Sequence, residues 1–176
     1  RAGSLARDAQ APAERRDRRG RVACGPHDPP FGRGRRVRDN VALPLGLRHV
    51  PQADVRKRVD EALELVGLLD VGQMYPHQLS GGMQQRVALA RCLINDPELI
   101  LMDEPLGALD ALTREKMQSL ILKIWKETGK TIMIITHSVE EALMLGERLF
   151  VMAPRPGRLH KEYRLPFAEI GRAHVW

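Results

Sequence analysis

The chain has 176 residues with 43% hydrophobic, 28% charged and 4% aromatic content, which suits one domain with a modest core. Its formal net charge is +6, but the excess lies within residues 1–39, which hold 11 Arg and five acidic residues. Residues 40–176 are neutral overall, so we expect no nucleic-acid binding from them. No apolar run reaches the roughly 18 to 20 residues of a membrane span, and no signal peptide is recognisable at the start.

Residues 1–36 are rich in Arg, Gly, Pro and Ala and contain no Lys. So few large apolar side chains cannot offset the entropy cost of ordering a segment, and we expect this one to be disordered. Periodic apolar patterns begin near Asn40. The expected elements are helices over residues 51–69, 80–94, 112–128 and 138–145 and strands over residues 99–102, 131–135, 148–152 and 158–165.

The first two strands are short, continuous apolar runs, which is typical of strands buried on both faces. Strands that alternate with helices predict an α/β fold with a parallel sheet. We interpret the third strand as part of that sheet and the fourth as edge-like. The carboxyl ends of parallel strands are where ligands bind, so residues that follow the strands are the first to consider.

The second predicted helix begins with Leu79-Ser80-Gly81-Gly82-Met83-Gln84-Gln85. Ser80 is a good N-cap, and two glycines leave the backbone N–H groups of the first turn open to a close approach by an anion. Taken alone, the motif favours a structural interpretation, a capped helix with a glycine-softened first turn.

Acidic and imidazole side chains follow the two apolar strands. Asp103 and Glu104 come directly after residues 99–102, and His137 follows residues 131–135 and Thr136. One carboxylate can hold Mg²⁺ while its neighbour polarises an attacking water. His137 at the same edge of the sheet is a candidate sensor of a transferring phosphate, although a lone histidine is more often structural.

Together these motifs resemble the ATP-binding cassette (ABC) ATPases. Residues 79–91 resemble the family's signature, 99–105 its Walker B strand, 106–110 its D-loop and 136–138 its H-loop, in the family's order. Residues 37–45, 111–115, 139–143 and 153–158 resemble the nitrate, sulfonate and taurine importer branch. The resemblance covers about residues 37–166. It implies a partial P-loop NTPase fold, with a mostly parallel sheet, flanking helices and part of the helical signature subdomain.

The resemblance also implies roles for individual residues. Ser80, Gly81, Gly82 and Gln84 would bind ATP held mainly by a second ATPase subunit, and Asp110 of the D-loop would link the two sites. Asp103 would position Mg²⁺, Glu104 would act as general base and His137 would stabilise the transferring phosphate.

The partners implied are a second copy, an integral membrane permease contacted by residues 37–48, and a solute-binding protein that acts through the permease. The implied location is the cytoplasmic face of the bacterial plasma membrane, and the cargo a small anion such as nitrate, a sulfonate or taurine.

One family element is missing from the 176 residues. No Gly-x-x-x-x-Gly-Lys-Ser/Thr phosphate loop (Walker A) is present, and no Q-loop glutamine stands shortly before Val37. Gly129-Lys130-Thr131 does not qualify, because Ile124 stands where the first glycine belongs and the triplet leads from a helix into a strand. Without the lysine and the N–H cradle, we expect the chain alone to bind Mg-ATP very weakly and to hydrolyse none.

The resemblance divides the chain into residues 1–36, a signature subdomain over 37–96, the C-terminal half of an ATPase core over 97–166, and a tail over 167–176. Residues 1–36 are either a divergent tail or a wrong-frame translation of GC-rich DNA, and their composition favours the second. The tail also looks non-native. Two alternatives to a truncated importer ATPase stay open: an inactive half-site chain that supplies signature residues in trans, and a soluble ABC protein that does not transport.

Overall fold

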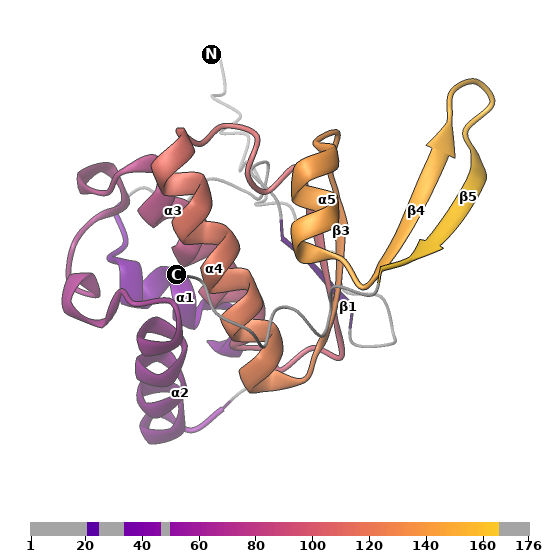
Figure 1. Ribbon diagram of the computed structural model, residues 1–176. Coiled ribbons are helices and arrows are strands. Elements are labelled where there is room, and N and C mark those ends of the chain that lie inside the picture. The colour runs from indigo at the N-terminus through magenta and orange to yellow at the C-terminus, as the bar shows by residue number, and fades with distance from the viewer. Residues whose placement is uncertain (1–20, 25–33, 47–49, 166–176) are drawn as a thin grey trace, which may run out of the picture.

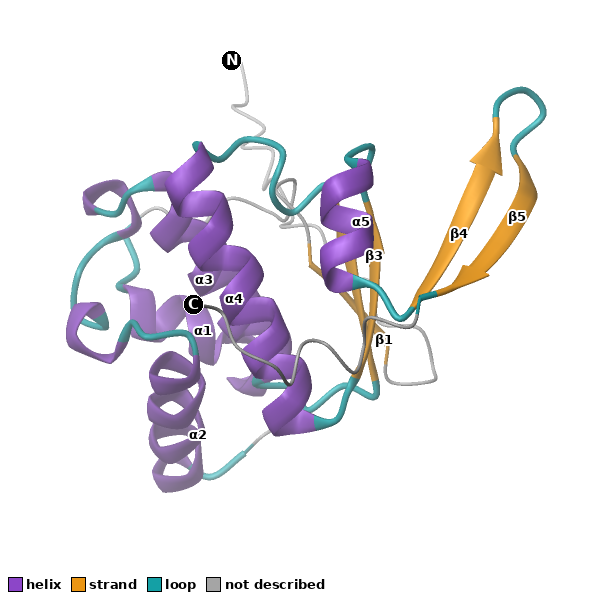
Figure 2. Ribbon diagram, in the orientation of Figure 1, coloured by secondary structure: helices purple, strands orange, loops and turns teal. Residues whose placement is uncertain are grey.

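The computed structural model describes residues 21–24, 34–46 and 50–165. Its centre is a three-stranded parallel sheet of β1 (Arg21–Cys24), β2 (Leu99–Asp103) and β3 (Thr131–Ile135) in the order β1-β2-β3. The long helix α4 (Ala111–Thr128) connects β2 to β3, since two parallel strands need such a crossover. The expected α/β fold with a mostly parallel sheet and flanking helices is confirmed (Figure 2).

The remaining helices are α1 (Val37–Gly46), α2 (Gln52–Leu65), α3 (Gly81–Leu93) and the short α5 (Val139–Leu145), with 3-10 turns at Leu69–Val71 and Pro76–Gln78. Helices α1 to α4 gather on one side of the sheet, and α5 lies beside β3 (Figure 1). The core lies between these helices and the sheet. Fully buried members include Leu45, Leu63, Val87, Ile100, Leu106 and Ile124.

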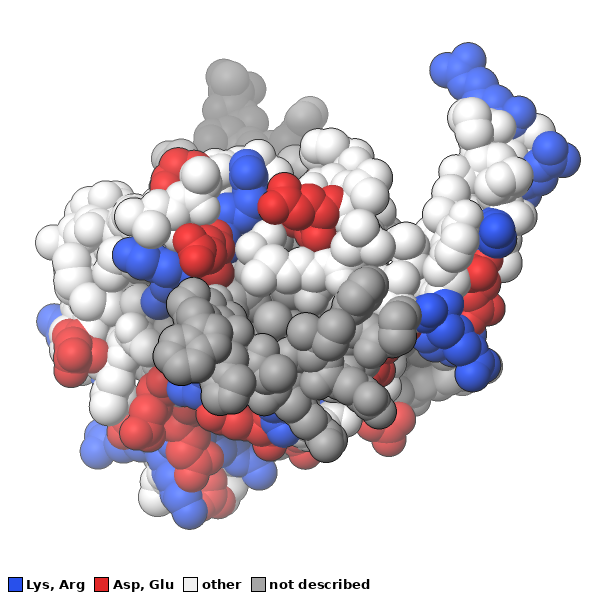
Figure 3. Space-filling view, viewed as in Figure 1, with Lys and Arg blue, Asp and Glu red and all other residues white. Residues whose placement is uncertain are grey.

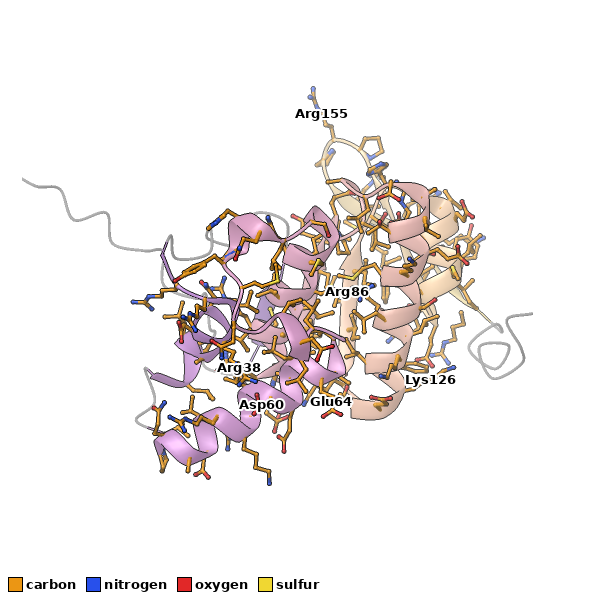
Figure 4. The ribbon with its side chains drawn as sticks, turned by 90° about the vertical axis from the view of Figure 1, so that its left-hand side faces the viewer. Arg38, Asp60, Glu64, Arg86, Lys126 and Arg155 are labelled. Carbon is orange, nitrogen blue, oxygen red and sulfur yellow. The ribbon has the colours of Figure 1, made fainter. Side chains whose placement is uncertain are left out.

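Polar contacts join the first two helices to their surroundings. Arg38 of α1 forms an ion pair with Asp60 of α2, and both are labelled in Figure 4. The first N–H groups of α1 are satisfied from outside the helix, because Val37 donates to the Met74 carbonyl and Arg38 to the Gly72 carbonyl, each at 2.9 Å. No helix was expected over residues 37–46, where Pro44 interrupts the apolar pattern.

Helix α2 ends at Leu65, four residues before the expected end at residue 69. The cause is Gly67, which has a positive φ of 67°. The Leu68 N–H bonds to the Leu63 carbonyl at 2.8 Å and the Gly67 N–H to the Glu64 carbonyl at 2.9 Å, which is the Schellman pattern of a helix end. Leu63 and Leu68 are both buried in the apolar core.

Strands β4 (Arg148–Ala153) and β5 (Arg158–Arg164) form a separate antiparallel hairpin, not an extension of the parallel sheet. The expectation that residues 148–152 add a third parallel strand is therefore wrong. The hairpin projects away from the helices, with Arg155 at its outer end (Figures 1 and 4). Phe150, Met152, Leu159 and Tyr163 are exposed on it, and Figure 3 shows basic side chains along its length.

The expectation that β2 and β3 are buried on both faces is also wrong. Ile100 and Met102 of β2 are buried, and Leu99 and Leu101 on its other face are only partly covered. On β3 the exposed side chains include Met133 at 52% and Ile135 at 54% of their surface. The sequence pattern is that of a strand covered on both sides, but in the described residues helices cover only one side.

Strand β1 lies inside the segment of residues 1–36 for which we expected disorder. Residues 21–24 pair with residues 99–102 of β2 in parallel register. The physical reason is that β2 is an apolar strand with unpaired backbone groups along its free edge, and even a short segment that pairs there satisfies them. Residues 1–20, 25–33 and 166–176, to which the other expectations for the two termini refer, lie outside the described residues.

Candidate functional site

The carboxyl ends of β2 and β3 bring two of the expected residues into direct contact. His137 Nδ1 lies 2.8 Å from a carboxylate oxygen of Glu104. The Glu104 N–H donates to the Ile135 carbonyl at 2.9 Å, which continues the ladder between β2 and β3 by one bond. The parallel sheet therefore places the two side chains together, as the sequence predicts for residues that follow neighbouring strands.

Glu104 has an unusual backbone conformation, with a positive φ of 47°. For a residue with a Cβ this left-handed conformation costs of the order of 1–3 kcal/mol, and such residues concentrate at functional sites. Here the conformation turns the chain sharply after β2, so that the Glu104 side chain reaches His137 while Pro105 and Leu106 return to the core. Asp103, the last residue of β2, is exposed at the same edge.

The contact changes the acid–base behaviour of His137. The hydrogen bond with Glu104, and next the negative charge of that carboxylate, raise the pKa of His137 above its ordinary value. The His137 side chain is 80% exposed and that of Glu104 37%, so both groups are accessible to a ligand. His137 Nε2 has no hydrogen-bond partner among the described residues, and it is available to a second group.

The Ser-Gly-Gly motif caps α3 as expected. The Ser80 hydroxyl oxygen accepts a hydrogen bond from the Met83 N–H at 3.3 Å. The two glycines differ in their surroundings. A Cβ on Gly81 would meet nothing within 4 Å, whereas a Cβ on Gly82 would come within 2.5 Å of the Thr113 methyl carbon. Gly81 therefore leaves the N-terminus of α3 open, and Gly82 permits α3 and α4 to pack closely.

Gln84 is directed into the protein's own backbone. Its side-chain amide donates to the carbonyls of Pro76 at 3.1 Å and Leu79 at 3.2 Å. Both amide protons are thus used to hold the turn that leads into α3. Of the four signature residues that the sequence singles out, Ser80 and Gly81 are exposed, Gly82 is buried against Thr113, and Gln84 braces the turn.

Asp110 is the N-cap of α4, and its carboxylate accepts a hydrogen bond from the Thr113 N–H at 3.0 Å. Hydrogen bonds from Thr113 lower the pKa of Asp110 below its ordinary value. Since Gly82 packs on the same Thr113, the first turn of α4 joins the signature turn to the turn that follows β2. The sequence did not predict that Thr113 connects these two turns.

A hollow of about 480 Å³ lies elsewhere, between α2, α3 and α4. Val66, Leu112 and Leu120 line it, together with charged side chains from Glu64, Arg86 and Lys116. Figure 4 shows Arg86 between the helices. Asp103, Glu104 and His137 do not line this hollow; they lie at the carboxyl edge of the sheet. Among the described residues, no three or more His, Cys, Asp or Glu side chains converge as they would in a site that holds a metal by itself.

Residues 1–107 match the protein family described as "ABC transporter". The chain belongs to the ABC transporter family. That the family's signature, Walker B, D-loop and H-loop correspond to the turns at Ser80, Asp103, Asp110 and His137 stays a prediction, and the last two lie beyond the matched residues. No helix within the described ranges is long and apolar enough to cross a membrane.

Curated relatives narrow the likeness to one branch of the ABC transporter family. The chain is 71% identical over 135 residues to the taurine import ATP-binding protein TauB of Roseobacter denitrificans, covering 77% of this chain and 50% of that protein. It is 52% identical to the protein of the same name from Chromobacterium violaceum, again over 77% of this chain. The chain spans about half the length of the curated relatives it matches.

Solved ABC structures share the fold. The ATP-binding cassette MJ0796, solved as a dimer in a post-hydrolysis state with ADP and Pi, is 39% identical with a TM-score of 0.61, covering 74% of this chain and 56% of that one. The cbiO1 protein of Clostridium perfringens, part of the ABC transporter complex cbiONQ, is 26% identical with a TM-score of 0.73, covering 90% of this chain and 62% of that one.

Sequence reasoning included Thr136, Glu141 and Arg114 in motif segments but predicted no contacts for them. Ser138 is the N-cap of α5, and Glu141 follows it at the three-residue spacing of a capping box, a signal that was present in the sequence. Arg114 offered no such signal, because its partner lies on a different helix.

Proposed function

We propose that the protein is the ATP-binding and ATP-hydrolysing subunit of an ABC importer that energises uptake of a small anion such as taurine, a sulfonate or nitrate. The observation that carries the proposal is the contact of His137 with Glu104 at the carboxyl edge of the sheet, beside the exposed Asp103. The identity of 71% to a taurine import ATP-binding protein supports the importer branch and makes taurine the first solute to test.

The residues at this edge fit Mg-ATP by the chemistry of their donors. Mg²⁺ takes one or two carboxylates together with waters and phosphate oxygens, so it needs no protein cage, and Asp103 supplies such a carboxylate. The open backbone at Gly81, at the positive end of α3, suits a phosphate. When bound, Mg-ATP supplies the phosphoryl group that is transferred and the cation that offsets its charge.

The chain's own residues then have distinct tasks. Glu104 accepts a proton from the attacking water through its partly exposed carboxylate. His137 keeps Nδ1 on Glu104 and directs Nε2 at the phosphate, and its raised pKa favours the charged ring that stabilises an anionic transition state. Ser80, Gly81 and Gly82 meet ATP of a second subunit, and Gln84 holds their turn in shape. Asp110 links the two sites.

The assembly we propose has two such subunits on the cytoplasmic face of the bacterial plasma membrane. An integral permease contacts the region of residues 37–48, and a solute-binding protein delivers cargo to the permease. Because the 176 residues lack the Walker A loop, we propose that the chain alone binds Mg-ATP very weakly and does not hydrolyse it. ATP turnover by the chain above that of its Glu104→Gln variant would contradict this.

The test of the proposal restores the missing part. Residues 37–165 are joined to the part of the R. denitrificans relative that this chain does not cover, which we expect to supply the Walker A loop. We expect the joined subunit to hydrolyse Mg-ATP, and Glu104→Gln or His137→Ala to lower kcat by about 10²-fold or more while circular dichroism stays unchanged. A folded joined subunit without turnover, or one that is indifferent to both substitutions, would refute the roles assigned here.

The half-site alternative is favoured by one observation, the absence of a Walker A loop from the printed sequence. In that case the unaltered chain associates with an intact relative only when ATP is present. Equilibrium sedimentation of the mixture with and without Mg-ATP tests this alternative, because association that does not depend on ATP would refute it.

A further inference from the structure

A buried carboxylate stands behind the H-loop. Glu141, in the first turn of α5, is only 6% exposed. A carboxylate without partners in such a place costs several kcal/mol, so its retention requires close polar neighbours. Its polar neighbours come from two separate parts of the chain, the turn that leads into α5 and the helix α4.

The first set of contacts forms a closed ring around the His137 turn. The Thr136 hydroxyl donates to Glu141 Oε2 at 2.7 Å and accepts from the Ser138 N–H at 3.0 Å. The Glu141 N–H in turn donates to the Ser138 hydroxyl at 3.3 Å. In an ordinary capping box the glutamate side chain binds the N-cap N–H directly. Here the Thr136 hydroxyl stands between them, so the carboxylate holds the residue immediately before His137.

The second contact crosses to another helix. Arg114 Nε of α4 lies 3.6 Å from Glu141 Oε1, and Arg114 Nη2 donates to the Leu109 carbonyl at 2.9 Å. Leu109 directly precedes Asp110, the N-cap of α4. One guanidinium therefore faces both the buried carboxylate behind the H-loop and the backbone of the D-loop. An arginine suits this position because its planar fork offers several donors in fixed directions.

These contacts form one continuous path from Thr136 through Glu141 and Arg114 to Leu109. Helix capping alone explains the ring around Ser138, but it does not explain why the free oxygen of Glu141 faces a cation on α4. The α4 end of the path is itself fixed, since Asp110 caps the helix and Thr113 packs under Gly82.

We propose that Glu141 and Arg114 are positioning residues that couple the H-loop to the D-loop, so that the His137 turn and the Asp110 turn hold their geometry together. Neither residue touches the reacting atoms; both act through the turns they brace. The coupling itself does not depend on ATP. Its consequence for turnover rests on the function proposed above.

The test is amide hydrogen exchange, measured by mass spectrometry on the 176-residue chain without nucleotide. The variants are Glu141→Ala, Arg114→Met and the matched control Glu140→Ala, which removes the exposed neighbouring carboxylate of the same helical turn. We expect Glu141→Ala to speed exchange in residues 109–113, and Arg114→Met to speed exchange in residues 136–141, each by about 3- to 30-fold. The control should change neither segment.

The effect of each substitution on exchange in the other turn tests the coupling, because a helix cap alone would affect only its own helix. If Glu141→Ala loosens only α5 and leaves residues 109–113 as in the unaltered chain, the coupling is refuted. Residues 52–65 of α2, remote from both turns, report general destabilisation. Where they also exchange faster, the Arg114→Lys variant replaces Arg114→Met. It keeps the charge but cannot form both contacts, and slow exchange at both turns in this variant would likewise refute the proposal.

A second readout uses the joined subunit. Loss of positioning should lower kcat for ATP while KM stays near its unaltered value, since neither Glu141 nor Arg114 contacts the nucleotide. If the unsubstituted joined subunit is inactive, the proposed function fails and the exchange result still decides the coupling.

Discussion

The two signature glycines illustrate how much a single residue's surroundings matter. Gly82→Ala should lower the free energy of unfolding by about 1–3 kcal/mol, because the added Cβ would lie 2.5 Å from the Thr113 methyl carbon. Gly81→Ala, with nothing within 4 Å, should stay within about 0.5 kcal/mol of the unaltered chain or be slightly stabilising. Urea unfolding of both variants measures the difference.

A second substitution at Thr113 tests whether the close contact causes the stability loss of Gly82→Ala. Thr113→Ser removes the methyl carbon that the new Cβ meets, and should recover most of the stability lost by Gly82→Ala while leaving Gly81→Ala unaffected. Equal losses for the two alanine variants, or a loss that Thr113→Ser does not reduce, would mean that the close contact between α3 and α4 is not what Gly82 permits.

A pH titration tests the contact between His137 and Glu104. Glu104→Gln should lower the pKa of His137 toward about 6.5, because the hydrogen bond and the charge that raise it are weakened or removed. Nuclear magnetic resonance of the His137 ring gives both values, and the signals of the other histidines should not differ between the two proteins. An identical His137 titration in the two proteins would rule out the contact.

The direction of the pH effect on stability follows from the same shift. Because the folded-state pKa of His137 is raised, the contact with Glu104 stabilises the fold fully below the unfolded pKa of about 6.5, and this contribution is lost as the pH rises through the folded pKa. The stability difference between the unaltered chain and Glu104→Gln should therefore shrink on raising the pH from 6 to 9.

At the scale of elements, Gly129 offers a separate test of backbone conformation. It ends α4 with a φ of 63°, and a Cβ there would meet nothing within 4 Å. Gly129→Ala should lower the free energy of unfolding by about 1–2 kcal/mol, purely through the left-handed backbone. Gly46→Ala is the matched control, since Gly46 has equal space without a positive φ. Similar thermal melting of the two variants would contradict this account.

Local signals predicted most of the elements. Ser80, Ser138 and Gly129 mark helix ends that the structure confirms, and residues 131–135 form a strand as expected. The failures concern information that local sequence does not carry. Pro44 interrupts the apolar pattern of residues 37–46, so α1 was not predicted. The strand over residues 148–152 was placed in the wrong sheet, because its pairing partner depends on which strand lies beside it in the folded chain.

In the candidate site too, some features were predictable from local sequence and others depend on neighbours in the folded chain. Parallel topology predicts that Glu104 and His137 meet, because each follows an apolar strand of one sheet. The roles of Thr113 and Arg114 were not predictable, since they arise where α4 passes α3 and α5. The resemblance assigns Gln84 to phosphate, but its amide is committed to the carbonyls of Pro76 and Leu79, contacts that only the folded turn reveals.

At the scale of the whole molecule, the exposed apolar face of β3 carries a prediction about context. Exchanging both Met133 and Ile135 for Thr should change the stability of the 176-residue chain by less than about 0.5 kcal/mol, because both side chains are about half exposed. In the joined subunit, where we expect that face to be covered, the same change should cost about 1–3 kcal/mol.

Ile100→Thr is the control for this comparison, because Ile100 is fully buried and should be costly to replace in both proteins. Denaturant unfolding of the two proteins with each change provides the four values. If the Met133 and Ile135 change costs the same in both, the face is not a contact surface for the joined half.

We propose that these residues belong to an ATPase that drives uptake of a small anion. The most direct measurement is uptake of radiolabelled taurine by R. denitrificans cells that lack their own taurine import ATP-binding protein and express the joined subunit. We expect uptake to return with the joined subunit and not with its Glu104→Gln variant. A joined subunit that hydrolyses ATP in solution, yet restores uptake of neither taurine, other sulfonates nor nitrate, would contradict the claim.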